Sequence, residues 1–141
     1  MTFRAASLAA RLHAEQLDQR GELHMDHLTA VATLLRERWP DVPDYAAEAA
    51  WLHHAIGDKG ATSLSLLKAG VSPEAVRLVE VLTKPEGVDH PTWIETLASS
   101  REIWAIRIQL ADFAHTPAPS RARLEATERA LCEAGLNRQL A

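Results

Sequence analysis

Ligand-type side chains interrupt apolar helical sequence at three separate places in this chain. His27 lies in residues 25–31, His53 and His54 are adjacent within residues 52–56, and Asp112 follows residues 108–111, which are apolar except for Gln109. A polar group buried without a partner is costly, so three such interruptions call for a shared explanation. Imidazole nitrogens and carboxylate oxygens are ligands of divalent transition metal ions. The sequence therefore predicts a metal ion held between helices.

The elements that must position these residues are helices. Apolar residues recur at helical spacing along most of the chain, and no segment alternates as a strand would. Ser72 followed by Pro73 and Glu74 is typical of a helix start, and Thr62 also fits an N-cap. We predict an all-α bundle of about seven to eight helices, over residues 2–19, 24–39, 44–56, 63–70, 73–83, 92–99, 101–115 and 120–133.

Length, charge and composition limit the class of protein. The chain has 141 residues, 47% of them hydrophobic and 5% aromatic, and we expect one domain over residues 1–141. Its net charge of −4 argues against a nucleic-acid partner held by its phosphates. No apolar run is long enough to span a membrane, and residues 1–16 lack the apolar core of a secretory signal. Cys132 is the lone cysteine, which excludes an internal disulfide. We expect a cytoplasmic protein, and a homo-oligomer stays open.

The adjacent histidines constrain the geometry of the predicted metal site. Neighbouring residues on a helix differ by about 100° in direction, so His53 and His54 can share one ion only at the edge of a helix face. His27 and Asp112, on helices packed against that edge, could complete a set of four nitrogen and oxygen ligands. A lone histidine on an apolar helix is more often a hydrogen-bonded core residue, and His54 could simply point into the cleft.

The order of short motifs resembles one family from about residue 5 to residue 125. Residues 10–13 are similar to an A-x-x-H element, and residues 21–27 keep the spacing of G-x-P-Y-x-x-H. Residues 52–58 stand where L-H-D-x-x-E-D is expected, residues 81–84 resemble an L-T-K element, and residues 109–116 resemble K-L-A-D-x-x-x-N. The chain thus resembles the HD superfamily of metal-dependent phosphohydrolases. It is most similar to the RelA/SpoT-type (p)ppGpp hydrolase domain and the small alarmone hydrolases.

This resemblance implies an HD-domain helical fold, a divalent metal cofactor and a nucleotide or other small phosphorylated substrate. By position in the motifs, it assigns the metal ligands to His27, His53, His54 and Asp112. His13 and Lys84 could line a phosphate pocket or lie at the surface, and Thr116 stands at the family's asparagine position. Arg20 could contact a nucleotide or be an ordinary charge beside Gly21, and Trp93 could border the pocket where the other tryptophans pack in the core.

The departures from the family pattern concern the chemistry itself. His54 replaces the signature aspartate, so three imidazoles and one carboxylate would suit Zn²⁺, Ni²⁺, Co²⁺ or Fe²⁺ better than Mn²⁺ or Mg²⁺. Gly57 replaces the glutamate that in the family helps orient the attacking water. Asp58 is the nearby carboxylate that could accept a proton in its place. Gln109 and Thr116 replace the family's lysine and asparagine, and we expect weak or absent hydrolysis of guanosine polyphosphate.

Several interpretations therefore remain open. His24 and His115 each lie one helical turn from a predicted ligand, where they could orient it or could simply be exposed polar residues. The protein could be a working metal-dependent phosphohydrolase, or a catalytically degenerate HD domain serving as a ligand-binding or interaction module. A helical interaction protein without a metal is the third interpretation.

Overall fold

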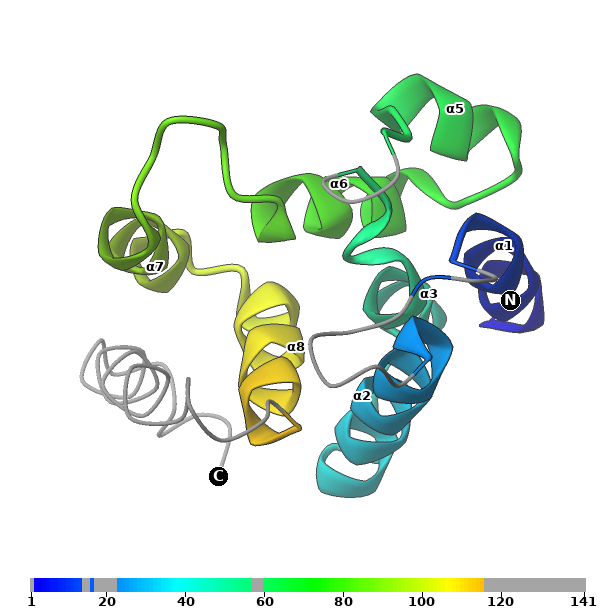
Figure 1. Cartoon of the computed structure of the whole chain (residues 1–141). Coiled ribbons are helices and arrows are strands. Elements are labelled where there is room, and N and C mark those ends of the chain that lie inside the picture. Colours follow the sequence, from blue (N-terminus) through cyan, green and yellow to red (C-terminus); the bar gives the residue numbers. More distant parts are fainter. Residues whose placement is uncertain (1, 14–15, 17–22, 57–59, 116–141) are drawn as a thin grey trace.

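The computed structural model describes residues 2–13, 16, 23–56 and 60–115, and this part of the chain forms helices joined by turns, with no β-strand. The predicted all-α bundle is thereby confirmed, and the chain is shown in Figure 1. The predicted helix over residues 120–133 lies outside the described residues. Seven helices are described, in the order α1 (Thr2–Leu12), α2 (His24–Arg38), α3 (Asp44–Leu52), α5 (Ser63–Lys68), α6 (Pro73–Leu82), α7 (His90–Ser99) and α8 (Ile103–Ala114).

Side-chain caps fix several helix starts. Ser72 accepts a hydrogen bond from the backbone N–H of Ala75 at the start of α6, and Thr62 forms a reciprocal capping box with Ser65 at the start of α5. Both starts follow the prediction. Helix α7 begins at His90, two residues earlier than predicted, because the carboxylate of Asp89 caps it. A cap side chain satisfies a backbone donor that the helix itself leaves open, so these residues set the boundaries.

Two predicted helix ends are wrong. Helix α1 ends at Leu12, well before residue 19, because the chain turns there. The backbone N–H of Gln16 donates to the carbonyl of His13 at 3.1 Å, and the carbonyl of Gln16 accepts from His24 at the start of α2. Helix α3 ends at Leu52, so His53 and His54 lie in the turn that follows it.

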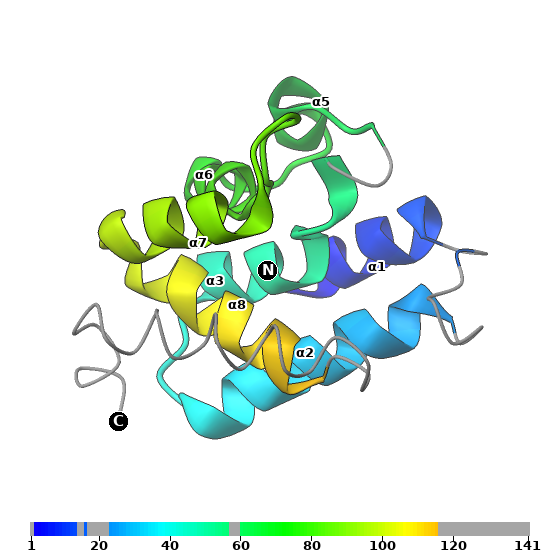
Figure 2. The ribbon, with the colours of Figure 1, turned by 60° about the vertical axis from the view of Figure 1, so that its left-hand side comes forward.

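Helix α3 occupies the centre of the bundle and packs against α1, α2, α6 and α8, as Figure 2 shows from a second direction. Its residues 46–50 are all buried, and four of these five are alanines. Small side chains allow the neighbouring helices to approach closely. The carboxylate of Glu48, the exception, accepts a hydrogen bond from the Ser72 hydroxyl at 3.0 Å.

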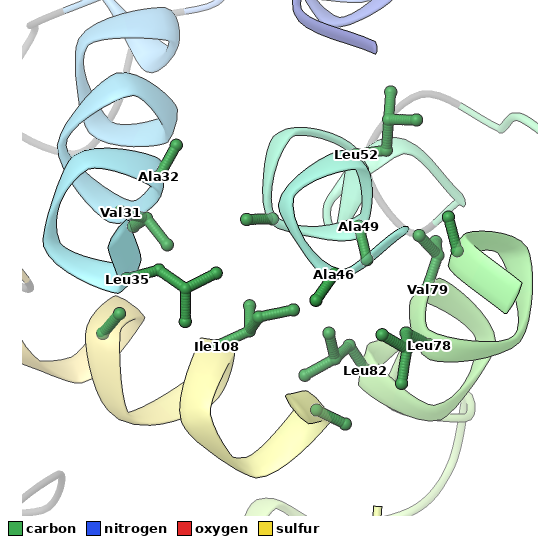
Figure 3. Close-up of a cluster of buried hydrophobic side chains, with 14 of the residues drawn as sticks. Val31, Ala32, Leu35, Ala46, Ala49, Leu52, Leu78, Val79, Leu82 and Ile108 are labelled. Atoms are coloured by element: carbon green, nitrogen blue, oxygen red, sulfur yellow. The ribbon is translucent and has the colours of Figure 1, made fainter. Parts of the chain in front are cut away.

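Larger side chains from the outer helices fill the space around α3. Leu35 of α2, Leu82 of α6 and Ile108 of α8 converge on Ala46 in Figure 3, and each is at most 5% exposed. This packing holds α2, α3 and α8 in fixed positions, and these helices carry the residues predicted to bind a metal. None of the described helices is both long and apolar enough to cross a membrane.

Candidate metal centre

The first predicted ligand, His27, lies in the first turn of α2 and faces α8. Its Nε2 atom is 2.6 Å from Oδ1 of Asp112, which lies near the end of α8. Its side chain is 13% exposed and that of Asp112 is 16% exposed, so both lie at the rim of the core. The close packing of α2 against α8 brings these two residues together across the chain.

The paired histidines occupy the turn at the end of α3. Nδ1–H of His53 donates to the carbonyl oxygen of Ala50 at 2.7 Å, because a carbonyl can only accept. This bond leaves Nε2 directed toward Asp112, 3.3 Å from Oδ1. The two imidazole centroids are 4.2 Å apart, so the turn brings both rings to one side of the helix end. The expected geometric conflict between adjacent helical residues is therefore avoided by ending the helix.

All four predicted ligands converge on one point. Nε2 of His54 lies 3.6 Å from the same Oδ1 atom of Asp112, so three imidazoles surround one carboxylate oxygen. One ligand atom from each of the four residues lies within 4.8 Å of the other three. Such a set of three nitrogens and one oxygen could hold a divalent metal ion.

The protonation states suit that role. Burial, and next the proximity of His54, lower the pKa of His53 below its usual value of 6.5. Contacts with Asp112 and the Ala50 carbonyl raise the pKa but do not offset this lowering. Burial alone would raise the pKa of Asp112, but contacts with His27, His53 and His54 outweigh it and hold the pKa well below 3.8. At neutral pH the carboxylate is charged and His53 is neutral, as a metal ligand must be. A cation between the lone pair of His53 and the carboxylate oxygen would be attracted by both.

Further histidines surround the four converging residues. His24 is only 6% exposed, so the interpretation of it as an exposed polar residue is wrong. Its ring packs edge-on against His54, with centroids 5.0 Å apart, and also lies 4.6 Å from the ring of His13. His115 is partly buried, and its Nδ1 lies 2.9 Å from Nδ1 of His27. His24 and His115, each one helical turn from a predicted ligand, thus contact the ligands His54 and His27, respectively.

A pocket opens beside the cluster. Its volume is about 310 Å³, and its described lining comes from the turn after α3, the end of α6, the start of α7 and α8. The lining residues are His53, His54, Leu82, Thr83, Lys84, His90, Trp93, Gln109 and Asp112. Lys84, predicted to bind substrate, is therefore beside the cluster, and Trp93 borders the pocket as the sequence suggested.

The other predicted substrate-binding residues are placed differently. His13 is fully buried, and its Nδ1 is hydrogen-bonded to Oε1 of Gln16 at 2.7 Å, so its side chain contacts Gln16 and His24. Arg20, Thr116 and the predicted proton acceptor Asp58 lie outside the described residues.

His90 is a pocket residue that the sequence reasoning missed. It is the first residue of α7, and its ring lies 5.8 Å from that of Trp93. The signal that could have placed it was Asp89, an N-cap residue type directly before His90-Pro91. An N-cap at Asp89 predicts a helix that begins at His90. His90 and Trp93 then lie one helical turn apart, on the same face of the helix.

The helical bundle and the histidine–aspartate cluster held between α2, α8 and the turn after α3 define the class of protein. The HD domain family matches residues 5–114, and the chain therefore belongs to that family. The fold is similar to that of a solved structure, a metazoan ortholog of SpoT that hydrolyzes ppGpp and plays a role in starvation responses. The two are 18% identical, with a TM-score of 0.78 over 94% of this chain and 84% of the other. Comparison with curated protein sequences gives no significant match.

Proposed function

We propose that this protein is a metal-dependent phosphohydrolase whose ion is bound by His27, His53, His54 and Asp112. The observation that carries the proposal is the convergence of three Nε2 atoms on Oδ1 of Asp112, at 2.6, 3.3 and 3.6 Å. The imidazole nitrogens that contact the Asp112 carboxylate are the atoms through which histidine binds a metal, and they come from different elements of the fold. A divalent ion would satisfy all four groups at once.

The adjoining pocket supports a small phosphorylated substrate, such as a nucleotide. Its volume of about 310 Å³ falls in the range of small-molecule sites. Lys84 supplies a positive charge at its edge, and its ammonium also donates to the carbonyl of Val88 at 2.6 Å. An ammonium has three protons, so this bond leaves Lys84 able to donate to a phosphate oxygen. His90 lines the same pocket and offers a further ring nitrogen.

The residues around the cluster each have a defined task. A bound divalent ion would polarise a phosphoryl oxygen and lower the pKa of a bound water. Asp112 balances the charge of the ion, and the bond from His53 to Ala50 keeps that imidazole oriented. His54, 31% exposed, faces the pocket that would hold the phosphate. We assign proton acceptance to Asp58 on the sequence alone.

We propose at most weak activity toward ppGpp. The metazoan ortholog of SpoT with the similar fold hydrolyzes ppGpp. This chain has Gly57 where a carboxylate could assist, and general acid–base assistance is typically worth about 10²–10⁴-fold in rate. Gln109, which lines the pocket, contributes no charge. Turnover should therefore be slow, and the double change His54→Asp with Gly57→Glu should increase it.

The second candidate is a catalytically degenerate HD domain that binds a ligand or partner without turnover. Gly57 in place of a carboxylate favours it, since the pocket and the cluster could bind a phosphorylated ligand without activating water. A helical interaction protein without metal is the least supported, because it gives no reason for three imidazoles to converge on one carboxylate oxygen.

Two measurements test the proposal. Element-resolved metal analysis of the purified protein should show a transition metal that is lost in Asp112→Asn. A turnover screen with ppGpp and simple nucleotides, using Mn²⁺, Zn²⁺, Ni²⁺, Co²⁺ or Fe²⁺ in turn, should detect release of phosphate or pyrophosphate by the wild type and none by Asp112→Asn. Metal binding without turnover on any substrate would favour the degenerate module. Failure of the purified protein to bind any of these ions would refute both.

A further inference from the structure

His115 contacts His27 on the side opposite to Asp112. The Nδ1 atoms of the two imidazoles are 2.9 Å apart, while Nε2 of His27 lies 2.6 Å from Oδ1 of Asp112. The two ring centroids of the histidine pair are 5.1 Å apart, at an interplanar angle of 41°. His27 is thus held at both ring nitrogens, by two residues from the C-terminal part of α8 and the turn after it.

A histidine that binds a metal through Nε2 needs a place for its remaining proton. That proton sits on Nδ1, and an acceptor there fixes both the tautomer and the ring orientation. For His53 the acceptor is the carbonyl oxygen of Ala50, at 2.7 Å. For His27 the group at hydrogen-bond distance from Nδ1 is Nδ1 of His115. A neutral imidazole with its proton on Nε2 presents a lone pair at Nδ1, so His115 can accept this bond.

We propose that His115 is a positioning residue, which accepts the Nδ1–H of His27 and so directs its Nε2 at the ion. This inference rests on the proposed metal site. His115 lies three residues after Asp112, and its backbone N–H donates to the Asp112 carbonyl oxygen at 3.2 Å. One turn of chain therefore supplies both a metal ligand and the acceptor that orients the ligand facing it from α2.

The orientation of the His27 ring thus depends on two residues, Asp112 in α8 and His115 in the turn that follows α8. Loss of His115 would leave the ring of His27 free to rotate or to adopt the other tautomer, although Asp112 would stay in place. Changing the outer partner of a metal-bound histidine typically weakens metal affinity by about 10–100-fold. A side chain that only packed against His27 would instead affect the stability of the metal-free protein.

The test compares three variants of the full chain with the wild type. His115→Phe keeps a ring of similar size but has no acceptor, whereas His115→Asn keeps a carbonyl oxygen near the position of Nδ1. His115→Ala removes the acceptor without adding bulk, in case the phenylalanine variant does not fold. Zn²⁺ affinity is measured by competition with a chromophoric chelator, and thermal unfolding is measured in excess EDTA.

We expect about 10–100-fold weaker Zn²⁺ binding by the phenylalanine and alanine variants, and affinity within a few-fold of wild type for the asparagine variant. In the Zn²⁺-bound wild type, ¹⁵N NMR should show a scalar coupling across the N–H···N bond of the two imidazoles. Equal Zn²⁺ affinity in all four proteins would overturn the inference alone. A wild type that does not bind Zn²⁺ or any other transition metal would overturn the proposed function, and this inference with it.

Discussion

Replacing His54 by aspartate should change which ion the protein prefers, because it changes the charge of the cluster. The described cluster holds three imidazoles and a single carboxylate. Aspartate at position 54 would add a second negative charge and a hard oxygen donor. Mn²⁺ prefers such donors, whereas imidazole-rich sets suit Zn²⁺ and its neighbours.

The size of the effect follows from the distance to Asp112. Nε2 of His54 lies 3.6 Å from Oδ1, and the shorter aspartate side chain would place its oxygen somewhat farther away. Two like charges about 5 Å apart at an effective dielectric constant of about 20 repel by about 3 kcal/mol. His54 is 31% exposed, so solvent screening reduces this to about 1–3 kcal/mol. The metal-free variant should be less stable than the wild type by that amount, and a divalent ion should reverse the loss.

The assay is thermal unfolding in EDTA, in Mn²⁺ and in Zn²⁺, with His54→Asn as the matched control. Asparagine has the size of aspartate without its charge, so it should neither destabilise the metal-free protein by repulsion nor gain Mn²⁺ affinity. Mn²⁺ should stabilise His54→Asp more than it stabilises the wild type. If the aspartate and asparagine variants respond equally to Mn²⁺, His54 does not touch the ion and the assignment of four ligands is wrong.

Three other outcomes follow from the same contacts. Asp112→Asn should weaken Zn²⁺ binding by more than the roughly 100-fold typical of outer partners, which chelator competition would show; an unchanged affinity would exclude Asp112 as a ligand. In EDTA, the free energy of unfolding should fall as the pH drops below 6.5, because the unfolded chain protonates His53 more readily than the folded one. It should fall again as the pH drops through 3.8 and below, where the low pKa of Asp112 ceases to stabilise the fold; a pH-independent melting temperature from pH 7.5 to 3 would contradict both steps. Ser72→Ala should cost about 1–3 kcal/mol in urea unfolding, since it removes a helix cap and the hydroxyl donor to buried Glu48; Ser72→Thr, which keeps the hydroxyl, should lose much less.

The sequence allowed correct predictions of structure where a residue acts on its own neighbourhood or where burial of a polar side chain requires a partner. Helix α6 could be predicted from Ser72 and Pro73, because a cap and a fixed backbone angle act locally. The convergence of His27, His53 and Asp112 was also predictable, since polar residues on apolar helix faces need a shared partner. The start of α6 depends on adjacent residues, and the convergence of the three polar residues follows from the cost of burying them without partners.

Three features could not be predicted from the sequence, because they depend on contacts between residues that are distant in the chain. Helix α1 ends at Leu12, and beyond it the backbone N–H of His24 donates to the carbonyl of Gln16, a contact about which periodicity carries no information. The burial of His24 and the contact from His115 to His27 likewise arise only when α2 meets its neighbours. For these two residues, each one turn from a predicted ligand, the sequence alone favoured exposed positions over a role in orienting the ligand.

The alanines of α3 have a consequence for the kind of ion that the cluster can accept. His27 and Asp112 belong to helices that both rest on α3, where residues 46–50 are buried and mostly alanine. Helices α2 and α8 pack directly against each other, and both also rest on this third helix, which supplies no ligand from its own length. An added methyl group in this layer would overpack the core and strain the positions of α2 and α8, which carry a nitrogen and an oxygen only 2.6 Å apart. The ionic radius that the proposed site would select thus depends partly on buried residues that would never contact the ion.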